Sequence, residues 1–188
     1  MPQDPMTGIH TLNANIGNVF LIGYRATGKT TVARILAELL GWTCVDADQV
    51  LEERHGRTIR RIFAEEGEAG FRDKEAALLE EFCNNERQVI ATGGGIVLRE
   101  SNRKRLQGAG WVVWLTADAQ TLWQRLQGDP TSMERRPPLT VGGLAEIEEV
   151  LRLREPLYQS LARWTVETAE RPPHAVANAI LDRLSSSG

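Results

Sequence analysis

The amino-acid sequence predicts an α/β fold, in which a mostly parallel sheet is covered by helices on both faces. Short strand-like runs alternate with longer segments of helical periodicity along the 188 residues of the chain. Strands that are separated by helices favour parallel pairing through crossover connections. The most apolar of the runs, at residues 19–22, is continuous, as expected for a strand buried on both faces.

The helix that follows this first strand is the clearest in the sequence. Between Val32 and Leu40, apolar residues recur at the spacing of one helical face, which predicts a helix over residues 30–40. Gly41 comes directly after it, in the position where glycine commonly ends a helix. The sequence therefore predicts a buried strand, a connecting loop and a helix in immediate succession.

The remaining elements continue the same alternation. Further strands are predicted at residues 43–45, 88–91, 111–115 and 164–167. Helices are predicted at residues 59–64, 70–83, 102–107, 119–126, 144–161 and 174–184. Within the helix at 144–161, Pro156 is expected to kink or restart the helix near Arg154, because proline removes a backbone hydrogen bond.

The chain is predicted to form one domain, at residues 18–184, because 188 residues leave little room for two. Residues 1–17 are polar with several prolines and glycines and are expected to be a flexible tail, and residues 185–188 are expected to be a frayed end. Residues 128–143 hold three prolines and two adjacent arginines. A segment this polar and this long is typical of a functional lid or of a disordered loop.

Composition excludes several classes of function. A net charge of −3 argues against a general nucleic-acid-binding protein, which would need a basic face. No apolar run approaches the ~18–20 residues of a membrane span, and residues 1–17 lack the features of a signal peptide. Cys44 and Cys83 have no metal-binding spacing, so we expect two reduced, mostly buried thiols in a cytoplasmic protein.

A phosphate-binding loop is the most specific motif in the chain. Residues 23–30 read Gly-Tyr-Arg-Ala-Thr-Gly-Lys-Thr, which matches the G-x-x-x-x-G-K-[ST] pattern between a strand and a helix. Gly23 and Gly28 allow the backbone N–H groups to turn inward onto an anion at the helix N-terminus. Lys29 is expected to reach the β- and γ-phosphates, and the Thr30 hydroxyl is expected to bind Mg²⁺. A chance match in a glycine-bearing turn is the alternative, and it leaves the flanking strand and helix unexplained.

The loop alone does not choose among the nucleotide-binding proteins. The guanine-reading Asn-Lys-x-Asp motif and the Asp-x-x-Gly motif of GTPases are absent from the sequence. The strand at 88–91, where an ATPase motor usually carries an acidic residue, leads into Gly93-Gly94-Gly95 instead. These absences favour a small-molecule kinase.

Two carboxylates follow the second strand. Asp46 and Asp48 are two residues apart, a spacing that points both side chains to one side of extended backbone near the strand's carboxyl end. Ligands bind at that end of an open α/β sheet. One carboxylate could hold a magnesium-bound water while the other accepts a substrate hydroxyl. A polar turn with Asp48 as a helix N-cap explains the same residues equally well.

Three further features suggest an acceptor site. Arg72 lies in an acidic stretch, and by itself it would be a surface residue paired with Glu68 or Glu75. The run Gly93-Gly94-Gly95 indicates close backbone approach or unusual torsions, although a tight loop without a ligand is the alternative. Arg154 begins the sequence Arg-Glu-Pro-Leu-Tyr inside a helical pattern.

Together these motifs resemble the shikimate kinase family over residues 18–184, nearly the whole predicted domain. Each motif is weakly specific by itself, but their common order is not expected by chance. The matching pieces are the phosphate loop, Val45-Asp46-Ala47-Asp48, Ile62-Phe63-Ala64, Gly67-Glu68, Phe71-Arg72, Glu75, Gly93-Gly94-Gly95, Arg136-Pro137-Pro138-Leu139 and Arg154-Glu155-Pro156-Leu157-Tyr158.

The resemblance implies a fold and an activity. The fold would be the three-layer P-loop NTPase fold of the nucleoside monophosphate kinase type, with a five-stranded parallel sheet in the order 2-3-1-4-5 and a lid. The activity would be ATP- and Mg²⁺-dependent phosphorylation of the shikimate 3-hydroxyl, in aromatic amino-acid biosynthesis. The resemblance also implies a monomer in the cytoplasm, with shikimate as the small-molecule partner and neither nucleic acid nor membrane as a partner.

The resemblance also implies a role for each matching residue. The expected catalytic residues are Lys29, Asp48 and Arg136. The expected nucleotide-binding residues are Gly23, Ala26, Thr27, Gly28, Lys29, Thr30, Thr31, Arg136 and Arg171. The expected shikimate-binding residues are Asp48, Phe63, Phe71, Arg72, Gly93, Gly94, Gly95 and Arg154. Mg²⁺ would be held by Thr30 and, through water, by Asp46.

Two departures from the family pattern affect these expectations. Ala26 stands where many members have a glycine, and its methyl group fits only if its φ is negative. Pro137-Pro138 replaces the usual single proline and leucine and should stiffen the lid. Two rival functions share the phosphate loop: a gluconate kinase, and a regulatory module without transfer activity. Arg72 with Arg154 favours a cyclic carboxylate as acceptor, and the intact set of charged residues disfavours a non-catalytic module.

Overall fold

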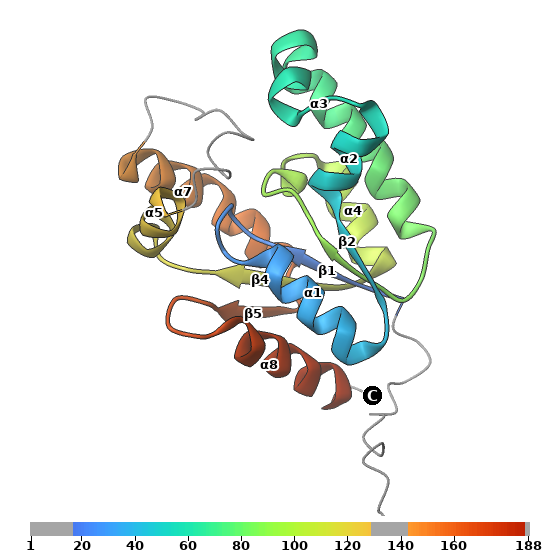
Figure 1. Ribbon diagram of the computed structural model, residues 1–188, viewed down its shortest axis with the longest axis vertical. Helices are drawn as coiled ribbons and strands as arrows, with labels where there is room; N and C mark the ends of the chain where they lie inside the picture. The colour runs from blue at the N-terminus through green and yellow to red at the C-terminus, as the bar shows by residue number, and fades with distance from the viewer. Residues whose placement is uncertain (1–16, 129–142, 187–188) are drawn as a thin grey trace, which may run out of the picture.

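Five parallel strands form a single sheet in the order β2-β3-β1-β4-β5 (Figure 1). The computed structural model of the protein describes residues 17–128 and 143–186. The strands are β1 (Asn18–Ile22), β2 (Thr43–Asp46), β3 (Gln88–Ala91), β4 (Gly110–Thr116) and β5 (Trp164–Glu167). The strand positions, their direction and their order confirm the predicted fold.

The central strand β1 explains why its sequence is continuously apolar. It lies between β3 and β4, with Asn18 opposite both Gln88 and Gly110, and all five of its residues are buried. Because every pairing is parallel, the carboxyl ends of the strands meet at one edge of the sheet. The loop residues 23–28 and 92–95 and the start of the helix after β2 all follow strands at this edge.

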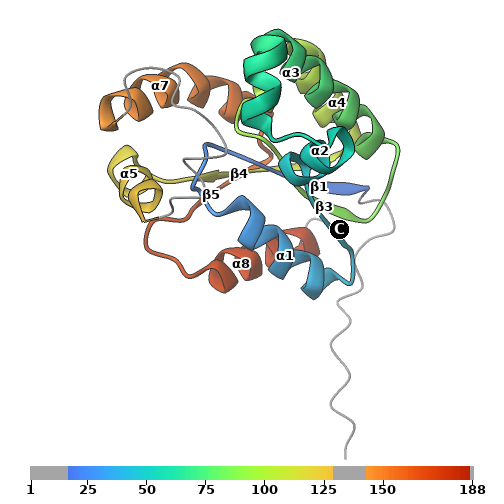
Figure 2. The same cartoon turned by 45° about the horizontal axis from the view of Figure 1, so that its top comes forward.

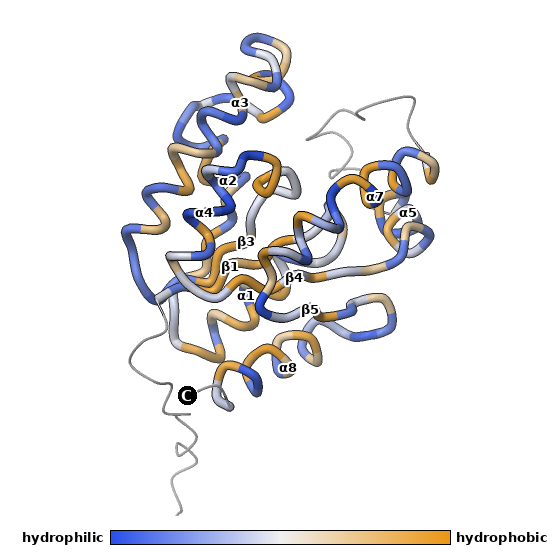
Figure 3. Tube along the Cα trace, turned by 180° about the vertical axis from the view of Figure 1, so that it is seen from behind, coloured by the Kyte–Doolittle hydropathy of each residue, from blue (hydrophilic) through white to orange (hydrophobic). Residues whose placement is uncertain are grey.

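Helices cover both faces of the sheet (Figure 2). One face packs against α1 (Lys29–Leu40) and α8 (Pro173–Ser186). The other face packs against α2 (Ala47–His55), α3 (Ile59–Cys83), α4 (Glu100–Ala109) and α7 (Leu144–Leu161). The short helix α5 (Ala119–Gln127) packs beside α7 and forms a third apolar cluster with it. Apolar residues gather on the strands and the inward sides of the helices (Figure 3).

Two elements are absent from the sequence-based prediction. Helix α2 buries only Leu51, so its sequence carries little of the periodicity that predicts a helix. The short 3₁₀ helix η1 (Ile96–Leu98) follows the glycine run. The two helices predicted at 59–64 and 70–83 are parts of α3, which is interrupted at Gly67, whose φ is 71° and ψ −177°.

Helix α7 continues through Pro156, so a restart near Arg154 is wrong, and the alternative of a kink there stays a prediction. Leu151 precedes the proline, and Tyr158 and Leu161 follow it, and all three are buried against the rest of the protein. Most helical stability in proteins comes from such packing. Here it outweighs the hydrogen bond that the proline removes.

The ends of the described elements also bear on the predictions. Gly41 ends α1 with a φ of 66°, as predicted, and α8 extends to Ser186.

Both cysteines are free, but Cys44 is exposed, so the expectation of two mostly buried thiols is wrong for Cys44. In the part of the chain that the structure describes, no helix is both long and apolar enough to span a membrane.

Candidate active site

The phosphate loop joins β1 to α1 and rests on the carboxyl end of β4. Gly23 has a φ of 138°, and a β-carbon there would collide with the carbonyl oxygen of Leu115. Gly28 has a φ of 89° and precedes Lys29, the first residue of α1. Only glycine tolerates both the positive φ and the close approach at Gly23. The loop therefore presents the N-terminus of α1 as an anion site at the edge of the sheet.

Lys29 lies against the inner side of this loop. Its ammonium group donates hydrogen bonds to the carbonyl oxygens of Gly23, at 2.9 Å, and Tyr24, at 2.7 Å. Thr27 is also buried, and its hydroxyl donates to the Tyr24 carbonyl at 2.8 Å. The Lys29 side chain thus holds positive charge within the curve of the loop, whereas Thr30 and Thr31, in the first turn of α1, are exposed.

Ala26 corrects one expectation from the sequence. Its φ is 63°, in the left-handed region, whereas the predicted tolerance of a methyl group required a negative φ. For a residue with a β-carbon this conformation costs ~1–2 kcal/mol, because the β-carbon crowds the following carbonyl oxygen. Such strain persists only where the surroundings enforce it. Ala26 therefore sits in the phosphate loop in a conformation that a glycine would adopt without this cost.

Asp46 joins β2 to the phosphate loop. Its Oδ1 accepts hydrogen bonds from the backbone N–H groups of Asp48 and Gln49, both at 3.1 Å, and caps α2. Its Oδ2 accepts a hydrogen bond of 2.6 Å from the Thr30 hydroxyl. Asp46, not Asp48, is therefore the N-cap, and the interpretation of Asp48 as the cap is wrong.

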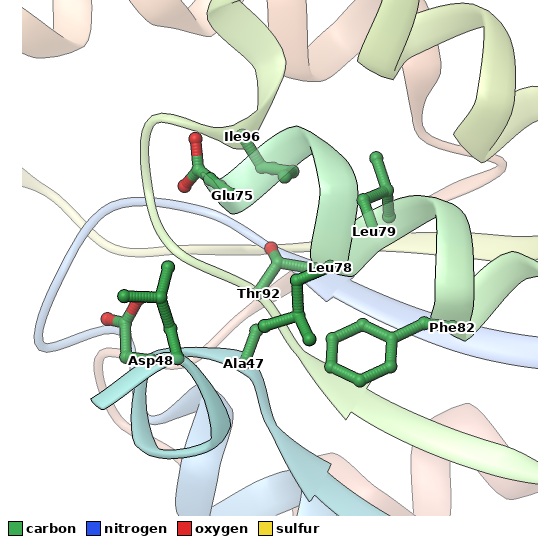
Figure 4. A pocket seen from close by; sticks show the side chains of 9 residues that line it. Ala47, Asp48, Glu75, Leu78, Leu79, Phe82, Thr92 and Ile96 are labelled. Carbon is green, nitrogen blue, oxygen red and sulfur yellow. The ribbon is translucent and has the colours of Figure 1, made fainter. Parts of the chain in front are cut away.

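The Asp48 side chain instead borders a small, partly open cavity between α2, α3 and the end of β3. The cavity has a volume of about 10 Å³, and its polar lining comes from Asp48 on α2, Glu75 on α3 and Thr92 after β3 (Figure 4). Leu78 and Phe82 belong to its apolar wall. Asp48 is half-buried, so its carboxylate lies between this interior and the solvent.

Arg72 is buried, so the alternative of a surface residue is wrong. Its Nη1 donates a hydrogen bond of 2.7 Å to Oε2 of Glu75, and only 8% of the Arg72 side chain and 5% of the Glu75 side chain are exposed. Glu68 contacts the same guanidinium at 3.3 Å. A β-carbon at Gly95 would collide with this guanidinium. Arg72 therefore lies directly on the backbone of the glycine run.

The run Gly93-Gly94-Gly95 is buried and contacts both sides of the site. A β-carbon on Gly94 would lie 3.2 Å from the carbonyl oxygen of Gly23 and 3.7 Å from the α-carbon of Tyr24. The turn is therefore in backbone contact with the phosphate loop, while Arg72 lies on its other end. This is the close backbone approach that the three glycines suggest, and the turn is more than a tight connection.

Helix α7 approaches the same turn through Tyr158. The Tyr158 hydroxyl donates a hydrogen bond of 2.5 Å to the Gly94 carbonyl oxygen, and its ring stacks against Trp114 with 5.7 Å between centroids. Arg154 is half-buried and one helical turn before Tyr158, so it lies on the same side of α7. The structure thereby places Arg154 on the helix face that is directed towards the turn.

Phe63 and Phe71 meet on either side of the Gly67 break in α3. Their ring centroids are 4.6 Å apart with an interplanar angle of 29°. Phe71 is fully buried, whereas Phe63 is half-buried. Of the two predicted substrate-contacting rings, only Phe63 has surface available to a ligand, and Phe71 supports it from the core.

The turn after β5 carries the residue predicted to lie near adenine. Arg171 is exposed there, close in sequence to Thr168 and Ala169. Arg125 of α5 belongs to no motif in the sequence and was not predicted. It joins this turn to the phosphate loop through hydrogen bonds to Thr168, Ala169 and Ala26. Arg136, Pro137 and Pro138 lie outside the described residues, as do most of the predicted tail and lid.

The residues at the loop fit a magnesium ion. The hydroxyl oxygen of Thr30 and Oδ2 of Asp46 lie 2.6 Å apart, and both are oxygen atoms that can bind a metal. Mg²⁺ prefers one or two protein oxygen ligands, completed by water and phosphate oxygens. Across residues 17–128 and 143–186, no three His, Cys, Asp or Glu side chains are grouped as a metal site. This arrangement suits a metal that arrives with a nucleotide.

The chain is similar to proteins of one family over most of its length. A family model described as shikimate kinase matches residues 25–185. A shikimate kinase of Rhodopirellula baltica is 42% identical over 171 residues, covering 90% of this chain and 91% of that protein. A shikimate kinase of Oleidesulfovibrio alaskensis is 44% identical, with 90% of this chain and 98% of that protein covered.

Solved structures give the same result. A structure of shikimate kinase from Acinetobacter baumannii in complex with shikimate has a TM-score of 0.86 and 37% identity, covering 92% of this chain and 95% of that one. A gluconokinase from Sinorhizobium meliloti has a TM-score of 0.58 at 18% identity, with 91% of this chain and 94% of that one covered. The second likeness supports the common fold alone.

Proposed function

The chain belongs to the shikimate kinase family, and we propose that it transfers the γ-phosphoryl group of ATP to the 3-hydroxyl of shikimate, giving shikimate 3-phosphate and ADP. The observation that carries this proposal is the contact between the phosphate loop and the glycine turn. The backbone of Gly94 packs against Gly23 on one side, and the guanidinium of Arg72 lies on Gly95 on the other. A nucleotide on the loop and a carboxylate on the arginine would therefore be neighbours.

Binding of ATP is proposed to use the loop amides and Lys29. The ammonium group has three donors, and it now reaches the carbonyl oxygens of Gly23 and Tyr24 and, at 3.4 Å, the Thr27 hydroxyl. A short movement of this side chain would bring it to the β- and γ-phosphates while part of its contact with the loop remains. Thr27, Gly28 and Thr31 complete the loop side of the site, and Arg171 is proposed to lie near the adenine.

Shikimate is proposed to bind on the side of the glycine turn that faces away from the phosphate loop. Arg72 and Arg154 would hold the carboxylate through charge-assisted hydrogen bonds, which arginine makes in pairs with good geometry. Glu75 keeps the Arg72 guanidinium in place from below. The backbone of Gly93, Gly94 and Gly95 would bound the ring on one side and Phe63 on another.

Transfer requires alignment and charge stabilisation more than covalent chemistry. The oxygen of the 3-hydroxyl forms a bond to the γ-phosphorus, the bond from that phosphorus to the ADP oxygen breaks, and the hydroxyl proton passes to the Asp48 carboxylate. Lys29 stabilises the charge that gathers on the phosphate oxygens. Arg136 is proposed to add a second positive charge from the lid, on the basis of the sequence alone.

Magnesium is proposed to be the required ion, held by Thr30 and, through water, by Asp46. When bound, Mg²⁺ would neutralise charge on the β- and γ-phosphate oxygens. The Asp46 side chain is held in place because its Oδ1 accepts hydrogen bonds from the backbone N–H groups of Asp48 and Gln49. We also propose that the protein acts as a monomer in the cytoplasm, as the resemblance to the family implies.

A coupled assay of ADP release tests the proposed function. The purified protein is given Mg²⁺-ATP with shikimate, quinate, gluconate, a nucleoside monophosphate or no acceptor. Among these acceptors, we expect only shikimate to give rapid ADP release. Excess EDTA should abolish the activity, and added Mg²⁺ should restore it. Preference for gluconate would favour the rival kinase, and ATP binding without release in any arm would favour a regulatory module.

A further inference from the structure

We propose that Arg125 is a positioning residue for the phosphate loop, and that it acts by holding Ala26 in its left-handed conformation. The proposal rests on the proposed binding of ATP at this loop. Arg125 lies in the last turn of α5, and its Nη1 donates a hydrogen bond of 3.2 Å to the carbonyl oxygen of Ala26. The two residues are 99 positions apart in the sequence.

The other hydrogen bonds of Arg125 anchor it to the sheet. Nη1 donates to the Thr168 hydroxyl at 3.0 Å, and Nη2 donates to the carbonyl oxygens of Thr168 at 2.5 Å and Ala169 at 3.4 Å. Thr168 is 3% exposed, and both its N–H and its hydroxyl donate to the carbonyl oxygen of Thr116 at the end of β4. Through Thr168, Arg125 is therefore anchored to the end of β4 in the central sheet.

Ala26 needs this anchor because its conformation is unfavourable for a residue with a side chain. Its φ of 63° would be freely accessible to glycine, but alanine populates it rarely. If the Ala26 carbonyl oxygen lost its partner, the peptide could relax to a negative φ. The N–H groups of Thr27 and Gly28 follow directly along the chain, so this relaxation would turn them away from a bound phosphate.

The shape of the arginine side chain suits this task. A guanidinium group is planar with five donors, so it can bind two separate backbone segments at once, whereas the ammonium of lysine is a single point. Apolar packing brings the segments together: Tyr24 and Ala26 of the loop contact the cluster that contains Leu122 and Trp123 of α5. The packing places α5 beside the loop, and the hydrogen bond fixes the torsion of Ala26.

The test combines variants of both residues with a ligand that lacks adenine. Wild type, Arg125→Met, Ala26→Gly and the double variant are titrated by calorimetry with Mg²⁺-ATP and with inorganic tripolyphosphate. Arg105→Met removes an arginine from a surface ion pair with Glu80 and is the matched control. Melting temperatures are recorded, and Arg125→Lys replaces Arg125→Met throughout if the latter does not fold.

We expect Arg125→Met to weaken the binding of ATP and of tripolyphosphate by about tenfold each, the scale of losing one charge-assisted hydrogen bond. Ala26→Gly should recover at least about threefold of that loss in the double variant, because glycine adopts the loop conformation unaided. Ala26→Gly alone is the reference for the double variant, and Arg105→Met should change neither affinity.

Three results would overturn the proposal. Weaker binding of ATP with unchanged binding of tripolyphosphate would mean that Arg125 contacts the nucleoside and does not shape the loop. If the double variant recovered no affinity for ATP or tripolyphosphate, Arg125 would not act through the torsion of Ala26. A lower melting temperature with both affinities unchanged would leave Arg125 a structural role only. If wild type binds neither ligand, the proposed ATP site itself fails, and this proposal fails with it.

Discussion

The hydroxyl of Tyr158 on α7 donates a 2.5 Å hydrogen bond to the carbonyl oxygen of Gly94, 64 residues earlier in the chain. Gly94 in turn packs against the carbonyl of Gly23 in the phosphate loop. One side chain therefore ties the helix that carries Arg154 to the turn that separates the two proposed substrates.

Tyr158→Phe should loosen the turn while leaving the ring in place. The buried Gly94 carbonyl oxygen would lose its hydroxyl donor, so the free energy of unfolding should fall by ~1–3 kcal/mol. The KM for shikimate should rise several-fold and the KM for ATP should change little, as measured by the coupled assay with each substrate varied in turn. Equal increases in both KM values would show that the hydrogen bond supports the whole site and not the turn.

Gly95→Ala should displace Arg72, because the added methyl group would collide with the buried guanidinium. We expect the KM for shikimate to rise by at least tenfold, since Arg72 cannot both avoid the methyl group and keep its place beside Glu75. Gly108→Ala in α4 is the control, because its β-carbon would meet nothing within 4 Å. A Gly95→Ala enzyme with normal shikimate kinetics would contradict the proposed role of Arg72.

Arg154→Ala should reduce kcat/KM for shikimate by the equivalent of ~2–5 kcal/mol, the cost of removing one partner from a buried charge pair. Affinity for ATP, measured by calorimetry, should remain within about twofold. Arg152→Ala removes an exposed arginine from the same helix, where it pairs with Glu149, and should leave both quantities unchanged. Collapse of ATP affinity in Arg154→Ala would reassign this arginine to the nucleotide.

Lys29→Ala should lower kcat by ~10²–10³-fold, the scale of losing one donor to the transition state. Lys104→Ala, which removes an exposed lysine from an ion pair with Glu100, is the matched control. Single-turnover measurements at saturating ATP separate the chemical step from weaker binding. Near-normal turnover in Lys29→Ala would contradict a role in catalysis.

His55 should contribute to the pH dependence of stability. Burial, followed by the positive charges of Lys74 and Arg57, lowers the pKa of His55 below its ordinary value of about 6.5. The unfolded chain therefore takes up this proton more readily, and stability should decline as the pH falls from about 6.5 towards the lowered pKa. Above about 6.5 the contribution is fully present.

His55→Gln should flatten this part of the profile, measured as the urea free energy of unfolding at pH 7.5, 6.5 and 5.5. His174→Gln, which removes an exposed histidine at the start of α8, is the matched control. An equally steep decline in His55→Gln and wild type would rule out His55 as the titrating group.

The strands and the phosphate loop could be predicted because local sequence determines them. A continuous apolar run such as residues 19–22 requires burial on both faces, and the loop pattern has meaning only between a strand and a helix. Helix α2 could not be predicted in this way, because its stability depends on the cap from Asp46 and on one buried leucine. The periodicity of so short an amphipathic segment is too weak to recognise.

Features that depend on tertiary contact were also beyond the sequence. The left-handed torsion of Ala26 contradicts the local preference of alanine, and its carbonyl oxygen accepts a hydrogen bond from Arg125, 99 residues away. The burial of Arg72 depends on Glu75 and the glycine turn together. The continuity of α7 through Pro156 depends on packing at Tyr158. In each case tertiary packing or hydrogen bonding overrides a local rule.

The backbone contact between Gly94 and Gly23 also limits how this enzyme can change over evolution. A β-carbon on Gly94 would lie 3.2 Å from the Gly23 carbonyl oxygen, so one of the two backbone segments would have to shift slightly, and the spacing between them is set by main chain. Phe63, by contrast, is proposed to border the acceptor, and it is half-buried. Redesign towards other cyclic acids should therefore substitute residues such as Phe63 and retain the contact between Gly94 and Gly23.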